Sequence, residues 1–184
     1  MENCKIFRFY KLISRPRSYR AHTVSDFYIS LWELKTQFLV TDDEIAKYVG
    51  KYERVSDVDY LEFLTELGAN QLIKRAATAS NPVLEVTYDS VSQEWNFQTS
   101  TKIIKNPLKF VLNEEKEERT QPRRLVKTKV TKNNDIFTVM QIAVRPRQKS
   151  TVFVFDFKDS GEVHVTFSIL GSPVVSKQVF KKIE

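Results

Sequence analysis

The residue types that usually carry catalysis or hold metal ions are scarce in this chain and far apart. Cys4 is the only cysteine, and His22 and His164 are the only histidines. A metal site or a Cys–His pair would have to join the N-terminal segment to a distant part of the chain. The four glycines form no phosphate-binding loop, and no nucleophile stands at a motif spacing from a base. We therefore expect no enzyme, no metal site and no cofactor. A single cysteine also allows no intramolecular disulfide, which favours a reducing compartment.

Two glutamines lie in segments that are apolar at alternate positions. Gln141 and Gln178 each carry an amide that donates and accepts hydrogen bonds, which suits a hydroxyl, ester or amide better than a bare carboxylate. The residues expected to line a cavity with them are mostly aromatic: Tyr60, Phe110, Val139, Phe153, Phe155, Val165, Phe167 and Phe180. Such a lining favours a long apolar tail by ~0.8 kcal/mol per buried CH₂. Two structural alternatives stay open: the aromatic residues form an ordinary core, and Gln178 is a satisfied structural amide.

One strand and two short helices come first among the elements that must position these residues. Residues 48–56 are predicted to form the strand, and Asp57 is the expected N-cap of the first helix. The apolar residues of that helix recur at i, i+3 spacing: Val58, Leu61, Leu64 and Leu67. Gly68 permits a turn, and Asn81-Pro82 ends the second helix. The second helix has a small apolar face (Leu72, Ile73, Ala76, Ala77) and a basic polar side (Lys74, Arg75).

From Val83 onward the apolar residues recur with a period of two, which predicts strands to the end of the chain. The predicted strands are 83–88, 95–101, 108–112, 115–120, 125–131, 136–143, 151–158, 162–170 and 174–181. Their short connections require antiparallel neighbours. With the first strand, they predict a mostly β fold: a ten-stranded, antiparallel up-and-down barrel. Pro107 cannot donate a ladder hydrogen bond, so its strand is expected to have one unpaired side.

Residues 1–47 differ in composition from the barrel, which we assign to residues 48–184. The first twenty residues are basic and amphipathic, typical of a disordered tail, and they also resemble an organelle transit peptide. A partly helical segment over residues 23–47 is expected to end before Thr41-Asp42-Asp43-Glu44, which reads as a helix N-cap with an acidic first turn. The net charge of +6 permits contact with anionic membranes or nucleic acid, although a lysine-rich solvated surface explains it as well. No apolar run is long enough to cross a membrane as a helix.

Several fragments of residues 48–184 resemble, in order and spacing, the intracellular lipid-binding protein family, which includes the fatty-acid-binding and cellular retinoid-binding proteins. These fragments are Val49-Gly50-Lys51-Tyr52, Asp59-Tyr60-Leu61-Glu62-Phe63-Leu64, Leu67-Gly68-Ala69, Ile73-Lys74-Arg75, Asn81-Pro82, residues 126–131 and residues 178–182. The resemblance implies a β-clam with a helix-turn-helix lid and a gap between its fourth and fifth strands. It also implies non-enzymatic binding and intracellular transport of a fatty acid, retinoid or other lipid by a cytoplasmic or nuclear monomer. The basic N-terminus leaves import into an organelle open.

The chain departs from the fatty-acid-binding pattern at the positions that hold a carboxylate. Gln178 and Phe180 stand where those proteins have an Arg-x-Tyr pair, and Phe155 or Asp156 stands where they have a further arginine. We expect Phe155 to face inward, because a buried and unpaired Asp156 would cost several kcal/mol. The Gln-x-Phe version resembles the retinol-binding members, so we predict a neutral head group that contacts Gln178. Retinol itself is disfavoured by Leu84, which replaces the lysine of those members.

Three further expectations depend on the resemblance. Arg124 matches a family arginine near the portal, with Pro122 in place of its aspartate partner. Ala77 is expected to meet the ligand from the lid. Lys74 and Arg75 are candidates for transient contact with an anionic membrane or an import factor, or they form a solvated helix face.

Two rival classes of protein remain for comparison. A lipocalin-like carrier shares the Gly-x-aromatic start, but it predicts a signal peptide, a disulfide and no paired helices after the first strand. A nucleic-acid-binding barrel would place Tyr88 and Trp95 on an outer face. The aromatic residues of this chain instead alternate with charged ones, as expected if they face inward, so we expect no nucleic-acid partner.

Overall fold

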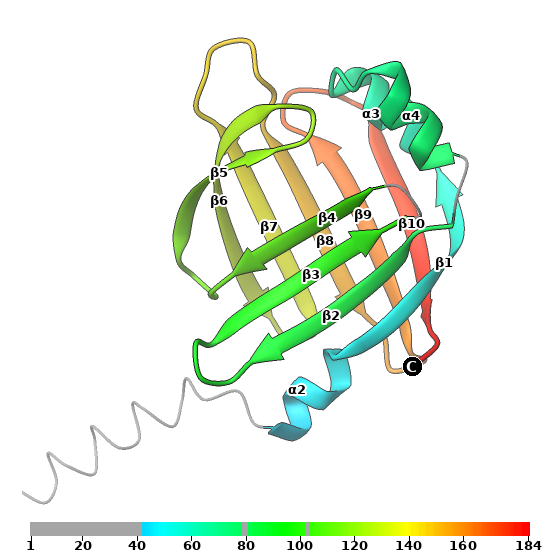
Figure 1. The fold of residues 1–184 in the computed structure, drawn as a ribbon, viewed down its shortest axis with the longest axis vertical. Coiled ribbons are helices and arrows are strands. Elements are labelled where there is room, and N and C mark those ends of the chain that lie inside the picture. The colour runs from blue at the N-terminus through cyan, green and yellow to red at the C-terminus, as the bar shows by residue number, and fades with distance from the viewer. Residues whose placement is uncertain (1–41, 79–80, 102–103) are drawn as a thin grey trace, which may run out of the picture. The chain divides into compact units, whose positions relative to one another are not determined.

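The computed structural model describes residues 42–78, 81–101 and 104–184, and in them the chain forms one ten-stranded antiparallel sheet (Figure 1). The strand order is β4-β3-β2-β1-β10-β9-β8-β7-β6-β5, so sequential strands are neighbours and β1 pairs with β10. The strands are β1 Gly50–Val58, β2 Val83–Asp89, β3 Glu94–Ser100, β4 Lys105–Phe110, β5 Glu115–Thr120, β6 Arg124–Asn133, β7 Ile136–Ala143, β8 Thr151–Phe157, β9 Glu162–Ile169 and β10 Val175–Lys182. The predicted up-and-down barrel is therefore confirmed.

The sheet closes through β1 and β10 but stays open between β4 and β5, its two edge strands. Pro107 lies on β4 opposite Gln98 of β3, and the other side of β4 has no partner strand among the described residues. The missing N–H of proline is tolerated there because an edge strand needs donors on one side only. The predicted unpaired side is thus confirmed, although β4 begins at Lys105, three residues before the predicted start.

The first strand begins later than predicted, because a helix precedes it. Helix α2 spans Asp42–Tyr48, and β1 starts at Gly50. Gly50 has φ +148°, and a Cβ on it would lie 2.4 Å from the backbone oxygen of Glu184. Glycine therefore lets the chain pass from helix to strand beside the C-terminus. Tyr48, predicted to be in the strand, instead ends the helix with its ring buried in the barrel.

Helices α3 (Tyr60–Glu66) and α4 (Gln71–Thr78) lie across the end of the barrel opposite α2 (Figure 1). The predicted N-cap is wrong: Asp57 lies in β1 and pairs with Arg54 at 2.7 Å. The cap is Asp59, which adopts φ 58° and makes no capping hydrogen bond with its side chain. The left-handed conformation turns the chain from β1 into α3 within one residue.

The inner face of the lid also differs from the predicted one. Phe63 and Leu64 are the buried residues of α3, whereas Val58 and Leu61 are about half exposed. Phe63 takes the inward position because its ring packs against Phe153 and Phe167 of the barrel. In α4 the predicted small face is present at Ala76, which is buried, but Leu72 is 71% exposed.

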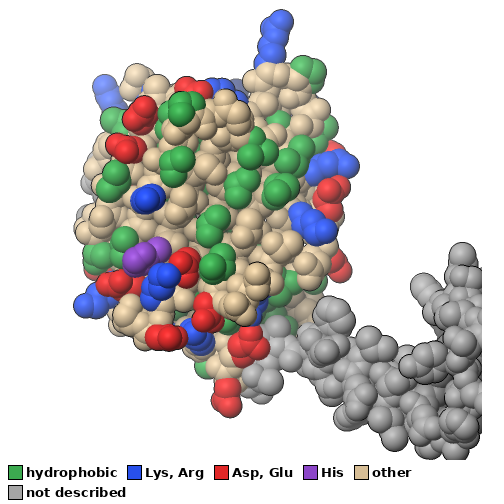
Figure 2. Space-filling model, turned by 180° about the vertical axis from the view of Figure 1, so that it is seen from behind, with side chains coloured by type: hydrophobic (Ala, Val, Ile, Leu, Met, Phe, Trp, Pro, Cys, Tyr) green, Lys and Arg blue, Asp and Glu red, His purple; other side chains and the backbone are tan. Residues whose placement is uncertain are grey.

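The strands alternate as their sequences predict, with inward side chains buried and outward ones in solvent. Figure 2 shows the outer face of the rear strands, where hydrophobic side chains lie between charged ones. The exposed apolar residues of the strands include Met140 and Ile142 of β7 and Val175 of β10, each 40–45% accessible. Scattered apolar residues of this kind are usual on β surfaces. Among the described residues, no helix is long and apolar enough to cross a membrane.

Candidate functional site

A cavity of about 740 Å³ lies between the lid and the barrel. The lid contributes Tyr60, Phe63, Ile73 and Ala77 to its wall, together with neighbouring small residues. Four phenylalanines of the barrel strands complete the apolar part of the lining: Phe97, Phe153, Phe155 and Phe167. Phe153 and Phe167 pack against each other with ring centroids 5.3 Å apart. The sequence prediction of an interior, mostly aromatic wall therefore has a physical counterpart in the fold.

The opposite end of the barrel is filled by aromatic rings. Phe137 lies at its centre and is fully buried, with ring centroids 5.1–5.3 Å from Tyr48, Trp95 and Phe97. Most of these pairs are edge-to-face, which is the favoured geometry for packed aromatic rings. We call the cluster of Tyr48, Trp95, Phe97, Phe137 and Phe157 the aromatic floor. Other predicted lining residues, Phe110, Val139, Val165 and Phe180, are packed in the same core cluster and do not line the cavity.

Arg124 is the most unusual polar residue of the cavity wall, because it is charged and only 4% exposed. It is the first residue of β6, directly after the β5–β6 turn. Its Nη1 donates to the backbone oxygen of Lys149 at 2.8 Å and to Oγ1 of Thr151 at 3.3 Å. Its Nη2 donates to Oε1 of Gln141 at 2.9 Å. We call Arg124, Gln141 and Thr151 the mouth cluster.

The guanidinium of Arg124 has no carboxylate partner among the described residues. Burial lowers the pKa of Arg124 to about 10, so it remains a cation at neutral pH. Its Nε is buried without a hydrogen-bond partner. Glu118 is the one acidic residue of the cavity lining, and its carboxylate accepts from the Thr128 hydroxyl at 2.6 Å. A buried cation without a counter-ion is costly, so this position suits an anionic ligand group.

Gln178 also faces the cavity but belongs to a different layer. It is 3% exposed, and its Nε2 has no hydrogen-bond partner. In the strand register, Gln178 of β10 pairs with Val165 of β9, and Val165 pairs with Phe155 of β8. The mouth cluster instead includes Thr151, at the start of β8. Thr151 and Phe155 are separated along β8 by about 13 Å, at ~3.3 Å per residue. The two predicted glutamines therefore do not form one site: Gln141 belongs to the mouth cluster, and Gln178 lies deeper.

The Phe155–Asp156 pair is oriented as expected. Phe155 is 6% exposed and packs against Phe97, with ring centroids 5.2 Å apart. Asp156 lies on the outer side, where Nζ of Lys158 is 2.5 Å from its carboxylate. The inward side chain at this level of β8 is therefore apolar.

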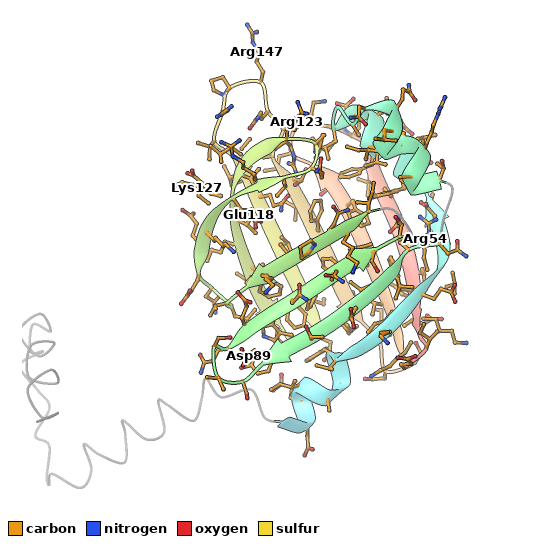
Figure 3. The ribbon with its side chains drawn as sticks, in the orientation of Figure 1. Arg54, Asp89, Glu118, Arg123, Lys127 and Arg147 are labelled. Atoms are coloured by element: carbon orange, nitrogen blue, oxygen red, sulfur yellow. The ribbon has the colours of Figure 1, made fainter. Side chains whose placement is uncertain are left out.

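Basic residues surround the mouth of the cavity. Arg119 lies in β5, Arg123 in the β5–β6 turn and Arg145 in the β7–β8 loop; all three line the cavity and are exposed. Figure 3 shows Arg123 beside the lid and Arg147 at the tip of the β7–β8 loop, both at the lid end of the barrel. We call Arg119, Arg123 and Arg145 the arginine rim. Neither the arginine rim nor Thr151 was predicted. The turn at residues 121–123 could have indicated the rim, and the inward-facing start of β8 in the alternating pattern could have indicated Thr151.

The predicted lid residues lie on α4. Ala77 lines the cavity, as expected for a ligand-facing position. Arg75 is exposed and Lys74 is half-buried, both next to the exposed Leu72.

Comparison with known proteins gives the family. No family model matches the chain. A fatty acid-binding protein of Lepidoglyphus destructor is 31% identical over 138 residues, which are 75% of this chain and 99% of that protein. The chain belongs to the fatty-acid-binding protein family. The resemblance inferred from the sequence fragments is thereby confirmed.

Solved structures of family members show the same fold. The apo structure of Caenorhabditis elegans lipid binding protein 8 is 26% identical, with a TM-score of 0.69 over 79% of this chain and 99% of that one. A Schistosoma mansoni fatty acid binding protein in complex with arachidonic acid is 21% identical, with a TM-score of 0.65 over 76% and 98% of the two chains. These structures confirm the barrel with its helical lid.

Proposed function

We propose that this protein binds a long-chain lipid of the fatty-acid class in its cavity and carries it without chemical change. The observation that carries the proposal is the 740 Å³ cavity, walled by aromatic rings and containing a buried cation. Relatives named as fatty acid-binding proteins, including one in complex with arachidonic acid, support this ligand class.

The size and lining of the cavity favour such a ligand. Small-molecule sites are usually about 300–1,000 Å³ and mostly apolar, with a few polar groups that fix orientation. A tail of about sixteen methylenes would gain on the order of 12 kcal/mol gross by burial. Ordering of the ligand and the lid reduces the net gain. Affinity would then come from the tail, and the few polar groups would select the head group.

A carrier role is supported by the chemistry of the wall. The polar side chains of the described cavity lining are arginines, one lysine, one glutamate, amides and hydroxyls, without a histidine or cysteine among them. His164 lies on the outer face of β9, exposed and 3.1 Å from Glu162. No group of three or more metal-ligating side chains occurs in residues 42–78, 81–101 and 104–184.

The direct test is a calorimetric titration of the delipidated full-length protein with oleate, arachidonate and retinol. We expect saturable binding of both fatty acids at one site per chain. Absence of saturable binding for all three would refute the proposal. Retinol binding without oleate binding would instead support the prediction of a neutral head group at Gln178, which stays a prediction.

We further propose that the carrier acts as a cytoplasmic monomer that touches anionic membranes through α4. Arg75, Lys74 and the exposed Leu72 place basic and apolar groups on one short helix, a combination that suits an anionic lipid surface. Reversing both charges should slow lipid transfer to anionic vesicles and leave transfer to neutral vesicles unchanged. If the charge-reversed variant transferred lipid to anionic vesicles as fast as the unaltered protein does, the proposed contact would be rejected.

We also propose that the residues before Asp42 are an appendage and that the barrel with α2 binds lipid by itself, which moves the predicted boundary from residue 48 to Asp42. In the structure the compact unit runs from Asp42 to Glu184 and includes α2. A chain that starts at Asp42 should therefore bind oleate as the full-length chain does, and a large loss of affinity would contradict this division.

A further inference from the structure

Two buried polar residues of the described cavity wall lie at different levels, and they differ in charge: Arg124 is a cation and Gln178 is neutral. The mouth cluster contains Arg124, with a cationic guanidinium and an unpaired Nε. The deeper layer contains Gln178, which offers a neutral amide N–H beside Phe155 and Val165. An anionic head group at the deeper layer would therefore be buried among aromatic rings with a single neutral donor, which is costly.

The mouth cluster lies at the open end of the barrel. Arg124 follows the β5–β6 turn, and its partner Lys149 belongs to the β7–β8 loop, which Figure 1 places at the lid end. The aromatic floor closes the other end, and Phe97 both belongs to it and lines the cavity. A lipid whose head group meets Arg124 would thus point its tail toward the floor.

The rim extends the positive charge beyond Arg124 toward solvent. Arg119, Arg123 and Arg145 line the cavity, are exposed, and form no ion pair within the described part of the chain. The one carboxylate of the lining, Glu118, is engaged by Thr128. A carboxylate satisfies one guanidinium, whereas a phosphate presents three oxygens and matches several arginines. The mouth therefore suits a head group that is larger and more negative than a carboxylate.

We propose that the cavity holds its lipid with an anionic head group at the mouth, on Arg124, and that the arginine rim favours an acyl chain bearing a phosphate over a free fatty acid. This inference rests on the proposed function, because it places the head group of a lipid that the cavity must first bind. It differs from a head group held at Gln178 in both orientation and charge.

Orientation can be read from Trp95, which lies in the aromatic floor and is 1% exposed. The chain has two tryptophans, so Trp32→Phe leaves Trp95 as the only one. In this full-length variant, stearate labelled with a nitroxide at carbon 16 should quench Trp95 fluorescence more strongly than stearate labelled at carbon 5, because the tail points to the floor. Equal quenching, or stronger quenching by the carbon-5 label, would overturn the proposal. The described lining residues of the cavity all keep their identity in this variant.

Head-group preference can be read with three lipids that share one oleoyl chain: oleate, oleoyl lysophosphatidic acid and the neutral monoolein. Arg124→Gln should weaken the two anionic lipids by about 10- to 100-fold, the range expected for lost charge-assisted hydrogen bonds. Monoolein should change much less. If Gln178→Leu weakened oleate and Arg124→Gln did not, the head group would lie in the deeper layer and the proposal would be wrong.

The rim is tested with the triple variant Arg119→Gln, Arg123→Gln, Arg145→Gln. It should weaken lysophosphatidic acid more than oleate, and by at least about tenfold if two charge-assisted hydrogen bonds are lost. A matched control with the same charge change is Lys129→Gln, Lys177→Gln, Lys181→Gln on the exposed outer surface, which should leave the ratio of the two affinities unchanged. An unchanged ratio in the rim variant would overturn the preference for phosphate. Failure of the unaltered protein to bind any of the lipids would instead refute the proposed function.

Discussion

The two ends of the barrel are built on opposite principles. At the floor, the polar groups pair with one another: the Tyr48 hydroxyl donates to Asp135 at 2.8 Å, and Nζ of Lys47 lies 2.8 Å from the same carboxylate. Five described residues keep a buried polar atom without a partner: Arg124, Gln178, Thr120 and Ser176 lie toward the lid end, and Asn96 is next to Trp95 of the floor in sequence. Unpaired buried groups cost stability, so their concentration at one end marks the place where a ligand completes the hydrogen bonding. The comparison suggests that the floor holds the fold and the mouth is kept incomplete for binding.

The largest effect should follow from a cavity in the floor. Phe137→Ala removes a fully buried ring that packs against Tyr48, Trp95 and Phe97. We expect the free energy of unfolding to fall by about 3–5 kcal/mol, measured by urea denaturation of the delipidated protein. Met140→Ala on the outer face of the same strand is the matched control, with a change within about 0.5 kcal/mol. A loss below about 1 kcal/mol for Phe137→Ala would break the assignment of the floor as the stabilising end.

At the mouth, removal of the buried charge should have the opposite sign. Arg124→Met keeps most of the apolar stem and deletes a cation that has no counter-ion in the described structure. Replacement of buried charges by apolar groups of similar size is often neutral or stabilising. We expect the delipidated variant to gain about 1 kcal/mol in unfolding free energy while its affinity for oleate falls. Destabilisation comparable to that of Phe137→Ala would show that the mouth cluster is structural.

The sequence predicted the strands well because each buries one face, so apolar residues recur at every second position. The lid was harder. Helix α3 has only seven residues, and leucines at i, i+3 spacing suggested one face while Phe63 occupies the barrel-facing position through its contacts with Phe153 and Phe167. Short helices take their orientation from tertiary packing, which a local pattern does not contain.

The site was partly predictable for a similar reason. Gln141 and Gln178 could be singled out as polar residues on inward positions and Arg124 through the family resemblance, and all three line the cavity. Their grouping could not be predicted, because Arg124 meets Gln141 and Thr151 only through the register of β6, β7 and β8. The absence of a carboxylate beside Arg124 within the described residues likewise depends on where Glu118 points.

A smaller effect should come from the ion pairs that hold α2 against the floor. Hydrogen bonds from Lys47 and Tyr48 hold the pKa of Asp135 below its ordinary value, so its ionised form stabilises the folded state. This stabilisation is present above the ordinary pKa near 3.8 and is lost as pH falls through the lower folded value. Asp135→Asn should cost about 1 kcal/mol at neutral pH and should lose less stability than the unaltered protein between about pH 5 and pH 3. Asp159→Asn, which removes the exposed partner of Lys47, is the control, and an identical acid response in both variants would reject the role of Asp135.

The smallest effect should appear in ligand release. Lys149 joins the lid to the mouth cluster, because its ammonium pairs with Glu66 of α3 while its backbone oxygen accepts from Arg124. Both charged groups are 39% exposed, so Glu66→Gln should cost less than about 0.5 kcal/mol of stability. Parting of the lid from the β7–β8 loop breaks this pair, so the variant should release oleate roughly twofold faster in stopped-flow measurements.

Two controls distinguish the effect of the Lys149–Glu66 ion pair from that of the overall charge of the lid. Glu62→Gln removes an equal charge from the exposed side of α3 and should leave the release rate unchanged. Raising the salt concentration should bring the unaltered protein toward the rate of Glu66→Gln, because exposed pairs are screened. If Glu66→Gln released oleate no faster than Glu62→Gln at low salt, the Lys149–Glu66 pair would not hold the lid closed. The packing of Phe63 on the barrel would then hold it, and the unpaired polar groups of the mouth would play no part in keeping it closed.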